Sequence, residues 1–445
     1  MTDKRIINKR LIIGLGMTGI SAARWCQRRG WAFDLCDTRP ELPAAEQIRH
    51  EFPHAELYLG ELQADLLSRY DQLIVSPGVA LATPAIQQAA AQGTEISGDI
   101  QLFAEQCDKP VIAITGSNGK STVTTLVGEL LQAAGKKTAV GGNIGVPALD
   151  LPEADIYVLE LSSFQLETTA NPEAWAAVIL NLSEDHMDRY SGMDDYLAAK
   201  QRIFHHCRHV VVNRDEAETR PASGQAVDYS FGLSAPAQGE FGLRSENGER
   251  WICFGHEKVI AASALKIKGL HNLANVMAAL ALVKTVGVEP ADVLPALQNF
   301  AGLDHRCQWL GEKQGVAFYN DSKGTNVAST LAAINGLGAE IRGKILLLAG
   351  GVGKGQDFSP LAPACAEFVS TVFSYGQDGE QIAMAVKDNC PVSRCSTMQE
   401  AFAAACQQAQ PGDVVLLSPA CASFDQFRSY ADRGNVFRSL VEDWL

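Results

Sequence analysis

A short glycine-rich stretch, ITGSNGKSTVT at residues 114–124, carries the residue types that bind phosphate. Gly116 and Gly119 let the backbone turn tightly, so that successive N–H groups can point at one anion. Lys120 adds a positive charge, the next two hydroxyl groups suit Mg²⁺, and a helix N-terminus favours negative charge. The stretch therefore predicts a phosphate-binding loop. Its spacing is shorter than the common G-x-x-x-x-G-K-[ST] pattern, which would place glycine at position 114.

A second glycine motif, Gly14-x-Gly16-x-x-Gly19, follows an apolar run near the start of the chain. Asp37 ends the next apolar run, where dinucleotide-binding folds place an acid that meets ribose. The motif alone indicates a nicotinamide-dependent oxidoreductase, a unit that binds the nucleotide part of a substrate, or merely a tight turn. Since the Lys120 loop already predicts one nucleotide site, the second interpretation is at least as good. The base and phosphates would then meet Asp37 together with Thr18, Thr38 and Arg39.

Polar side chains also follow two apolar runs in the middle of the chain. Glu160 ends the run at residues 156–161, where a Mg²⁺ ligand or a water-holding group would belong. His186 lies in NLSEDHMDRY, which follows the run at residues 176–182. Each would be an ordinary surface residue on its own. Two such segments in the same unit as a phosphate loop favour a shared site.

Other polar positions are less specific. Chemistry alone predicts that Lys200, in YLAAKQRIF, is a helix-surface lysine. Asn272 and Asn275 share one helical face and suit an adenine edge, although capping of the helix explains Asn272 equally well. Polar turns that end predicted strands or join predicted domains occur as DHR (304–306), NDSKGTN (320–326), AGGVGKGQDF (349–358) and SPACASFDQF (418–427).

The elements that position these residues alternate between short β-rich runs and amphipathic helices. This alternation predicts parallel α/β sheets, whose ligands gather at the carboxyl ends of strands. Residues 99–107 predict a helix that leads into the phosphate-loop strand, and residues 273–286 predict another helix. Between about residues 225 and 259 the pattern changes to glycine-punctuated short strands, which predicts a small antiparallel patch.

Composition bounds the class of protein. The chain has 445 residues, 47% hydrophobic and 20% charged, which is typical of a globular protein with about three domains. A net charge of −14 argues against sequence-independent binding of nucleic acid or of a membrane surface. The cysteines lack a C-x-x-C pair, and the N-terminus has only a short apolar run, so we expect no zinc site, disulfide framework or membrane insertion.

Taken together, these motifs resemble those of the Mur ligase family. TGSNGKST, GGNIG (141–145), ELSSFQLE, the His186 loop, YLAAK, HNLAN, DHR, NDSKGTN and SPACASFDQF occur in the order of that family. GLGMTG (14–19), DTR (37–39) and SPGV (76–79) are similar to the branch that adds D-glutamate to UDP-N-acetylmuramoyl-L-alanine. The family also includes folylpolyglutamate synthetase, whose phosphate loop is equally short, but the first glycine motif and DTR disfavour that branch.

The resemblance implies an α/β fold of three domains. These are an N-terminal Rossmann-like domain that binds the UDP substrate (1–98), a central P-loop ATPase-type domain with a parallel sheet (99–302), and a C-terminal Rossmann-like domain that binds the amino acid (303–445). It also implies a cytoplasmic, monomeric ligase of peptidoglycan precursor synthesis. Such an enzyme uses ATP and two Mg²⁺ sites, acts on small molecules, and binds neither nucleic acid nor membrane.

Family motifs also imply residue roles. ATP would meet Gly116, Ser117, Asn118, Gly119, Lys120, Ser121, Thr122, Asn272, Asn275, Arg306 and Asp321. The UDP substrate would meet Thr18, Asp37, Thr38, Arg39, Ser76, Gly78 and Asn143. D-Glutamate would meet Thr325, Lys354, Ser423, Phe424 and Tyr430, with Phe424 standing where leucine is familiar and Tyr430 where phenylalanine is. The catalytic group would comprise Lys120, Glu160, His186, Lys200 and Lys323.

Only the resemblance to the family implies that Lys200 helps to bind a metal ion. An ammonium cannot ligate a metal, but family members carry this lysine as a carbamate, a carboxylate-like group. One Mg²⁺ would be held by Ser121, Thr122 and Glu160, and the second by His186 and carbamylated Lys200. The remaining alternatives are an oxidoreductase, which leaves the Lys120 loop unused, and a nonenzymatic nucleotide switch, which leaves the C-terminal polar turns unexplained.

Overall fold

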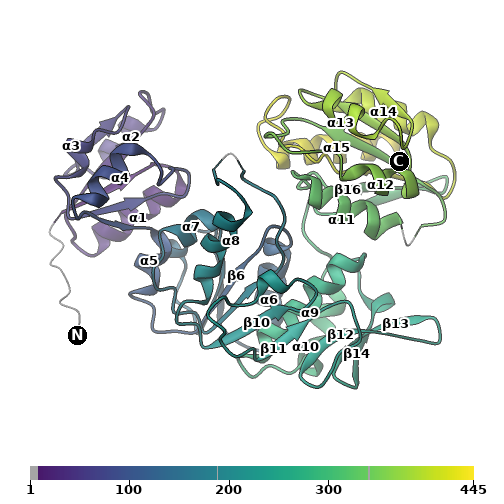
Figure 1. Ribbon diagram of the computed structural model, residues 1–445, viewed down its shortest axis with the longest axis horizontal. Coiled ribbons are helices and arrows are strands. Elements are labelled where there is room, and N and C mark those ends of the chain that lie inside the picture. The colour runs from purple at the N-terminus through teal and green to yellow at the C-terminus, as the bar shows by residue number, and fades with distance from the viewer. Residues whose placement is uncertain (1–8, 188, 339–340) are drawn as a thin grey trace.

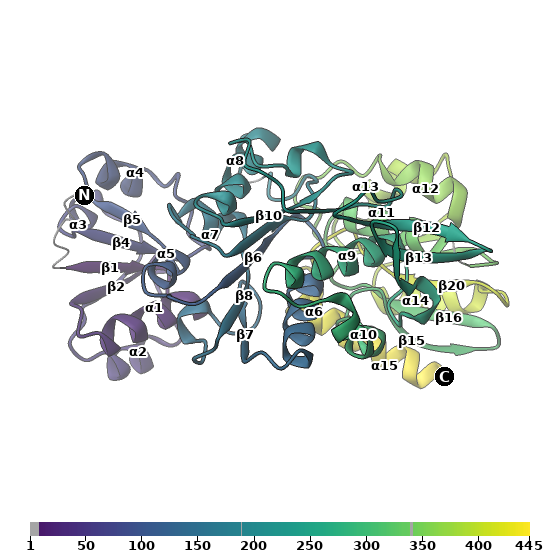
Figure 2. The same ribbon diagram turned by 90° about the horizontal axis from the view of Figure 1, so that it is seen from below.

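The computed structural model describes residues 9–187, 189–338 and 341–445. Over these residues the strands form three sheets, one in each of three consecutive parts of the chain. Figures 1 and 2 show the N-terminal part (purple) and the C-terminal part (green to yellow) at opposite ends of the central part. The predicted three-domain α/β fold is confirmed. The boundaries after residues 98 and 302 stay a prediction.

The N-terminal sheet is parallel, with the strand order β3-β2-β1-β4-β5. Short runs that are mostly apolar form its strands, which are β1 (Arg10–Ile13), β2 (Phe33–Asp37), β3 (Leu57–Leu59), β4 (Gln72–Val75) and β5 (Glu95–Ser97). The helices that join them are α1 (Met17–Arg28), α2 (Ala45–Glu51), α3 (Ala64–Leu67) and α4 (Pro84–Ala91). The turns after β1, β2 and β4 consequently meet at one edge of this sheet.

The central sheet has the order β14-β13-β12-β11-β10-β9-β6-β8-β7. Its strands are β6 (Val111–Thr115), β7 (Thr138–Gly142), β8 (Ile156–Glu160), β9 (Ala176–Ile179), β10 (His209–Asn213), β11 (Tyr229–Phe231), β12 (Glu240–Glu246), β13 (Glu249–Phe254) and β14 (Glu257–Ala261). The pairings of β13 with β12 and β14 are antiparallel, which confirms the predicted antiparallel patch. The helices are α5 (Asp99–Ala104), α6 (Lys120–Ala133), α7 (Ser163–Glu167), α8 (Met193–Gln201), α9 (Leu270–Lys284) and α10 (Pro290–Asn299), with short 3-10 turns at Ala148–Asp150, Arg202–Phe204, Ala217–Thr219 and Ala262–Ala264.

The C-terminal sheet has the order β15-β16-β20-β17-β18-β19. Its strands are β15 (Gln308–Lys313), β16 (Val316–Asn320), β17 (Ile345–Gly350), β18 (Val369–Tyr375), β19 (Val392–Arg394) and β20 (Val414–Leu417). Its helices are α11 (Val327–Gly338), α12 (Leu361–Phe368), α13 (Gly379–Val386), α14 (Met398–Gln408) and α15 (Tyr430–Trp444). The sheet is parallel except for β15, an edge strand that the sequence did not predict and that pairs antiparallel with β16.

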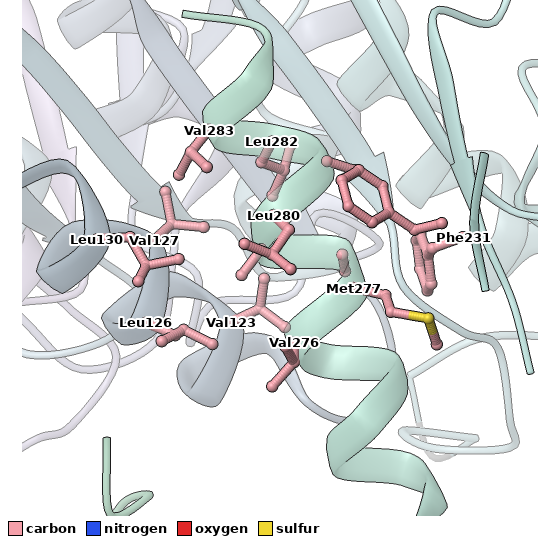
Figure 3. Close-up of a cluster of buried hydrophobic side chains, with 14 of the residues drawn as sticks. Val123, Leu126, Val127, Leu130, Phe231, Val276, Met277, Leu280, Leu282 and Val283 are labelled. Carbon is pink, nitrogen blue, oxygen red and sulfur yellow. The ribbon is translucent and has the colours of Figure 1, made fainter. Parts of the chain in front are cut away.

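Alternating residues of β6 build two layers of core. Ile112 and Ile114 face the layer formed by α6, α9 and α10, whereas Val111 and Ala113 face a layer that continues into the N-terminal domain. Figure 3 shows the first layer, in which side chains of α6 interdigitate with those of α9. This packing fixes the start of α6, and therefore the phosphate loop, relative to the start of α9.

Shortening a buried side chain between α6 and α9 should destabilise the central domain. Leu126 of α6 is fully buried in this layer (Figure 3). We expect Leu126→Ala to lower the free energy of unfolding by about 2–5 kcal/mol, because it leaves a cavity. Gln132→Ala, on the exposed side of the same helix, should change it by less than about 0.5 kcal/mol. Urea denaturation would measure both, and equal effects of the two substitutions would contradict this packing.

Two predicted helices have different bounds in the structure. Helix α5 ends at Ala104 rather than near residue 107, and α9 begins at Leu270 rather than at residue 273. Gly269, with a left-handed φ of +90°, precedes α9, so the helix starts where this glycine turns the chain. Throughout the part of the chain that the structure describes, every helix falls short of the length or apolarity needed to cross a membrane.

Candidate active site

The phosphate loop turns between β6 and α6, as predicted. Gly119 has a φ of +80°, and a Cβ atom there would lie 2.5 Å from Asn275 Oδ1, so the position requires glycine. Lys120 begins α6, and its Nζ donates to the carbonyl oxygens of Gly116 at 2.7 Å and Ser117 at 2.8 Å. Burial lowers the pKa of Lys120 below its usual value. The lysine charge therefore lies within the predicted phosphate-binding turn.

Glu160 lies at the carboxyl end of β8, adjacent to β6 in the sheet, and is only 3% exposed. Its Oε1 accepts a hydrogen bond from Asn143 Nδ2 at 2.8 Å. Its Oε2 is buried and has no hydrogen-bond partner among the described residues. Because an unpaired buried carboxylate oxygen is costly, this geometry fits a cation at Oε2.

His186 follows β9 and has a left-handed backbone, with φ of +59°. Its ring packs edge-on against Phe164 of α7, with 4.9 Å between ring centroids, and its Nε2 lies 3.7 Å from Asp185 Oδ2. Glu160 and His186 line the same cavity. The two polar segments that the sequence singled out therefore do share one site.

Lys200 is not the surface lysine that chemistry alone predicted. The residue is 1% exposed, because α8 turns this side of the helix toward the end of β6. Its Nζ donates to Gly116 O at 3.0 Å and lies 3.3 Å from Thr115 Oγ1. Burial, and secondarily the nearby Lys120, lower the pKa of Lys200 well below its usual value. The sequence prediction failed because the small and apolar neighbours of Lys200 were taken as incidental, whereas they mark a buried helix face.

These side chains meet in a cavity of about 350 Å³, here called the central cavity. Residues of the central and C-terminal domains line it, among them Ser117, Asn118, Gly119, Lys120, Asn143, Glu160, His186, Lys200, Arg306, Lys323, Thr325, Lys354, Ser423, Phe424 and Tyr430. Lysine and arginine side chains outnumber carboxylates among the residues that line it. In a chain of net charge −14, this local positive charge favours an anionic ligand.

The C-terminal domain supplies its part of the central cavity from strand ends. Lys323 follows β16, and its Nζ lies 3.9 Å from the ring centroid of Tyr430. Burial, and secondarily Arg306, lower the pKa of Lys323 to about 8. Lys354 Nζ lies 3.9 Å from Asp185 Oδ1 of the central domain. Phe424 lines this cavity while 73% exposed, so its ring lies at the cavity mouth.

A second cavity, here called the α9 cavity, adjoins the first. Asn118, Gly119, Arg306, Lys323 and Ser329 line both. Thr122, Asn272, Asn275 and Asp321 line the α9 cavity. This cavity therefore opens directly onto the phosphate loop.

The predicted amide pair of the α9 cavity forms its own network. Asn272 does not cap the helix, because its Nδ2 donates to Lys268 O at 2.8 Å and its Oδ1 accepts from Asn275 Nδ2 at 3.3 Å. The capping alternative is wrong. Nearby, burial raises the pKa of Asp321 to about 7, although Ser418 donates to its carboxylate at 2.7 Å.

Ser121 and Gly116 line neither of these cavities. Ser121 Oγ accepts a hydrogen bond from the Arg306 guanidinium at 2.8 Å, which ties the first turn of α6 to the start of the C-terminal domain. Gly116 contributes its carbonyl oxygen to both buried lysines. Thr122 lines the α9 cavity, whereas Glu160 lines the central cavity. Of the three predicted ligands of the first Mg²⁺, Glu160 is therefore the one that lines the central cavity.

A third cavity, here called the N-terminal cavity, gathers the other predicted group. Its lining includes Thr18, Asp37, Thr38, Arg39, Ser76, Gly78 and Asn143, and its volume is about 430 Å³. Burial would raise the pKa of Asp37, but hydrogen bonds from Arg39 and from the backbone N–H of Leu15 hold it at about 2. Asn143 lines both this cavity and the central cavity. Each cavity therefore shares lining residues with the next, from the N-terminal cavity through the central cavity to the α9 cavity.

Some lining residues were not singled out from the sequence. Asp185, Asn326, Ser329, Phe164 and Tyr196 all line the central cavity. Asp185, Asn326 and Phe164 lie inside the motifs SEDH, NDSKGTN and ELSSFQLE, so those polar segments already contained the signal. Tyr196 lies one helical turn before Lys200 and its ring contacts that ammonium, with 4.5 Å from Nζ to the ring centroid. Its i, i+4 spacing from Lys200 would have indicated a common helix face.

The side chains that line the central cavity supply only some of the ligands that a hard cation such as Mg²⁺ needs. No group of three or more His, Cys, Asp or Glu residues placed to hold a metal occurs within residues 9–187, 189–338 and 341–445. Glu160 nevertheless offers a buried oxygen without a donor. Mg²⁺ prefers to be bound by one or two carboxylates together with phosphates and water. The residues present therefore fit Mg²⁺ that arrives with a phosphate ligand.

Comparison with known families supports this three-part arrangement. Residues 8–98 match the Mur ligase MurD-like N-terminal domain, residues 114–283 the Mur ligase middle domain, and residues 305–421 the Mur ligase glutamate ligase domain. UDP-N-acetylmuramoylalanine--D-glutamate ligase from Pseudomonas fluorescens Pf-5 is 53% identical over 437 residues, with 98% of each chain covered. The protein of the same name from Pseudomonas aeruginosa PAO1 is 52% identical at the same coverage.

Solved structures share the fold at low sequence identity. A pseudomurein peptide ligase type C from Methanothermus fervidus superposes with a TM-score of 0.62 at 16% identity, covering 98% of this chain and all of that one. UDP-N-acetylmuramate-alanine ligase from Thermotoga maritima has a TM-score of 0.61 at 19% identity, with coverages of 98% and 99%. From the three domain matches and the full-length relatives, we conclude that the chain belongs to the Mur ligase family, whose members depend on ATP.

Proposed function

We propose that this chain joins D-glutamate to UDP-N-acetylmuramoyl-L-alanine, with ATP converted to ADP and phosphate. The observation that carries the proposal is the series of adjoining cavities, because a long substrate held in the N-terminal cavity can reach the phosphate loop past Asn143. The full-length relatives that share about half of its residues carry the name of this reaction. The activity makes a peptidoglycan precursor.

Each cavity has a proposed ligand. In the N-terminal cavity, Thr18, Asp37, Thr38 and Arg39 bind uridine, and Ser76, Gly78 and Asn143 follow the sugar diphosphate. In the α9 cavity, Asn272, Asn275, Arg306 and Asp321 bind the adenine nucleotide, while residues 116–122 surround its phosphates. In the central cavity, Thr325, Lys354, Ser423, Phe424 and Tyr430 bind D-glutamate. Support comes from the lining of each cavity, except for Gly116 and Ser121, whose assignment rests on their place in the phosphate loop.

The chemistry follows from charge. A carboxylate oxygen of the alanyl group forms a bond to the γ-phosphorus of ATP, and the bond from that phosphorus to the β-phosphate oxygen breaks, which releases ADP. The D-glutamate amine then attacks the acyl carbon through a tetrahedral intermediate and loses a proton as phosphate leaves. Both partners of the first step are anions, so Lys120 and Lys323 reduce their repulsion and stabilise the transferred group.

Mg²⁺ supplies further positive charge between these anions when it is bound. Glu160 would hold one ion together with the hydroxyls of Ser121 and Thr122, and His186 would hold a second with carbamylated Lys200. The unpaired Oε2 of Glu160 and the burial of Lys200 support these assignments.

The setting of the reaction follows from its substrates. UDP-linked sugars and ATP are cytoplasmic, so we place the enzyme in the cytoplasm, acting as a monomer on small molecules without nucleic acid or membrane insertion. Because the central cavity takes side chains from two domains, the C-terminal domain would close over the others during turnover.

Strict dependence on both co-substrates tests the proposal. Phosphate release from ATP should require UDP-N-acetylmuramoyl-L-alanine and D-glutamate together, with L-glutamate nearly inactive. A coupled assay of phosphate release, scanned over candidate amino acids and with each substrate omitted in turn, measures this. Equal turnover with L-glutamate, or with a folate in place of the sugar nucleotide, would contradict the assignment.

A further inference from the structure

A hydrogen bond crosses from the C-terminal domain to the phosphate loop. Ser329, in the first turn of α11, donates from Oγ to Asn118 Oδ1 at 2.6 Å. Asn118 belongs to the central domain, between Ser117 and Gly119 of the loop. Both Asn118 and Ser329 line the central cavity and also the α9 cavity. This contact therefore lies where the two cavities meet.

The acceptor side of this contact is held rigidly by the central domain. The backbone N–H of Asn118 donates to Asn181 Oδ1 at 2.8 Å, and Asn181 Nδ2 donates back to Asn118 O at 3.0 Å. Asn118 Nδ2 lies 3.4 Å from Ser183 Oγ. With its amide nitrogen directed to Ser183, Asn118 presents its Oδ1 to the C-terminal domain.

The donor side is held by the start of α11. Asn326 Oδ1 accepts a hydrogen bond from the backbone N–H of Ser329 at 2.8 Å and also lies 2.8 Å from Ser329 Oγ. The hydroxyl group has a single hydrogen to donate. When that hydrogen goes to Asn118, Asn326 Oδ1 keeps the hydrogen bond from the backbone N–H. Asn326 Nδ2 also lies 3.4 Å from Asp185 Oδ2, on the loop that carries His186. Ser329, in the first turn of α11, thus contacts the phosphate loop, and Asn326, directly before α11, contacts the His186 loop.

We propose that Ser329 is a positioning residue that couples the C-terminal domain to the phosphate loop through Asn118. This inference rests on the ligase function proposed above. Lys323 and Thr325 precede α11 on the same turn, so the docking of α11 sets where these side chains lie relative to Lys120. Since the reacting groups come from two domains, loss of this alignment slows the chemical step. The bridge makes no contact with the N-terminal cavity, so binding of the UDP substrate is independent of it.

A double-mutant cycle tests the coupling. Ser329→Ala should lower kcat by about 5- to 10-fold, the size expected for one positioning hydrogen bond. The KM for the UDP substrate should stay within about twofold of the parent value. Asn118→Ala should lower kcat at least as much, and the Asn118→Ala/Ser329→Ala double variant should be no slower than Asn118→Ala alone. Asn335→Ala, at an exposed position of the same helix, is the matched control and should match the parent.

The outcomes separate this inference from the proposed function. If the parent chain lacks turnover with the two co-substrates, the proposed function fails. If the parent is active but the effects of the two substitutions multiply in the double variant, or if Ser329→Ala is as fast as the parent, the positioning role of Ser329 is wrong. A rise in the KM for the UDP substrate equal to the fall in kcat would also overturn it, because that pattern indicates general disruption of the fold.

Discussion

Replacement of Lys200 by alanine is expected to leave the enzyme nearly inactive. The residue is 1% exposed, and its Nζ donates to two neutral oxygens at the end of β6, Thr115 Oγ1 and Gly116 O. A free ammonium there would repel Mg²⁺. Reaction of the amine with CO₂ gives a carbamate and a proton, and the carbamate can serve as an oxygen ligand beside His186. The alanine variant would lose that ligand where the acyl phosphate forms.

Small carboxylates should partly reverse this loss. The substitution leaves a cavity about the size of the missing side chain, which acetate can enter at high concentration. Initial rates would be measured against acetate at fixed ionic strength, with chloride as the control ion. Lys136→Ala, at an exposed position, is the matched variant and should keep full activity. A Lys200→Ala protein as active as the parent would contradict the role of Lys200 as a metal ligand.

Carbamylation itself has a signature that does not depend on turnover. In the parent, incubation with ¹³C-labelled bicarbonate should give a carbamate signal in the ¹³C NMR spectrum, and this signal should be missing from Lys200→Ala. Activity of the parent should fall in CO₂-depleted buffer and recover with bicarbonate. Equal carbamate signals from the two proteins would place the modification elsewhere.

Lys120→Ala should lower kcat by about 100-fold or more, as expected for loss of one preorganised charge at a transferring phosphoryl group. In the structure its Nζ lies within the loop, 2.7 Å from Gly116 O and 2.8 Å from Ser117 O. Binding of the UDP substrate should change little, because the N-terminal cavity does not include this lysine. Steady-state kinetics and calorimetric titration of the UDP substrate would measure the two effects. Normal turnover by the variant would exclude the loop as the ATP site.

Local sequence was sufficient to predict the elements that carry the site. The run that ends at Thr115, the glycines at 116 and 119 and the polar strand ends all form the predicted local structure, because strand, turn and helix preferences act over a few residues. The predicted fold class is confirmed for the same reason. The edge strand β15 was missed because its mixed polar residues lack strict alternation.

Relationships between distant segments were harder to predict. Lys200 is buried because α8 docks against β6. The residues next to Lys200 in the sequence do not reveal which distant segment packs over it. The bridge from Ser329 to Asn118 joins residues that lie far apart in sequence and in different domains. Such contacts arise from tertiary packing. Resemblance to a family supplied Lys200 as a site residue, whereas the bridge required the structure.

Transfer of an isotope from substrate to phosphate tests the central claim most directly. UDP-N-acetylmuramoyl-L-alanine labelled with ¹⁸O in both oxygens of the alanyl carboxylate would be incubated with ATP, D-glutamate and the enzyme. In an acyl phosphate mechanism one carboxylate oxygen stays with phosphorus when the amide forms, so each released phosphate should carry one ¹⁸O and the amide product should retain the other. Mass spectrometry of both products measures this. Unlabelled phosphate, or release of AMP in place of ADP, would contradict the account.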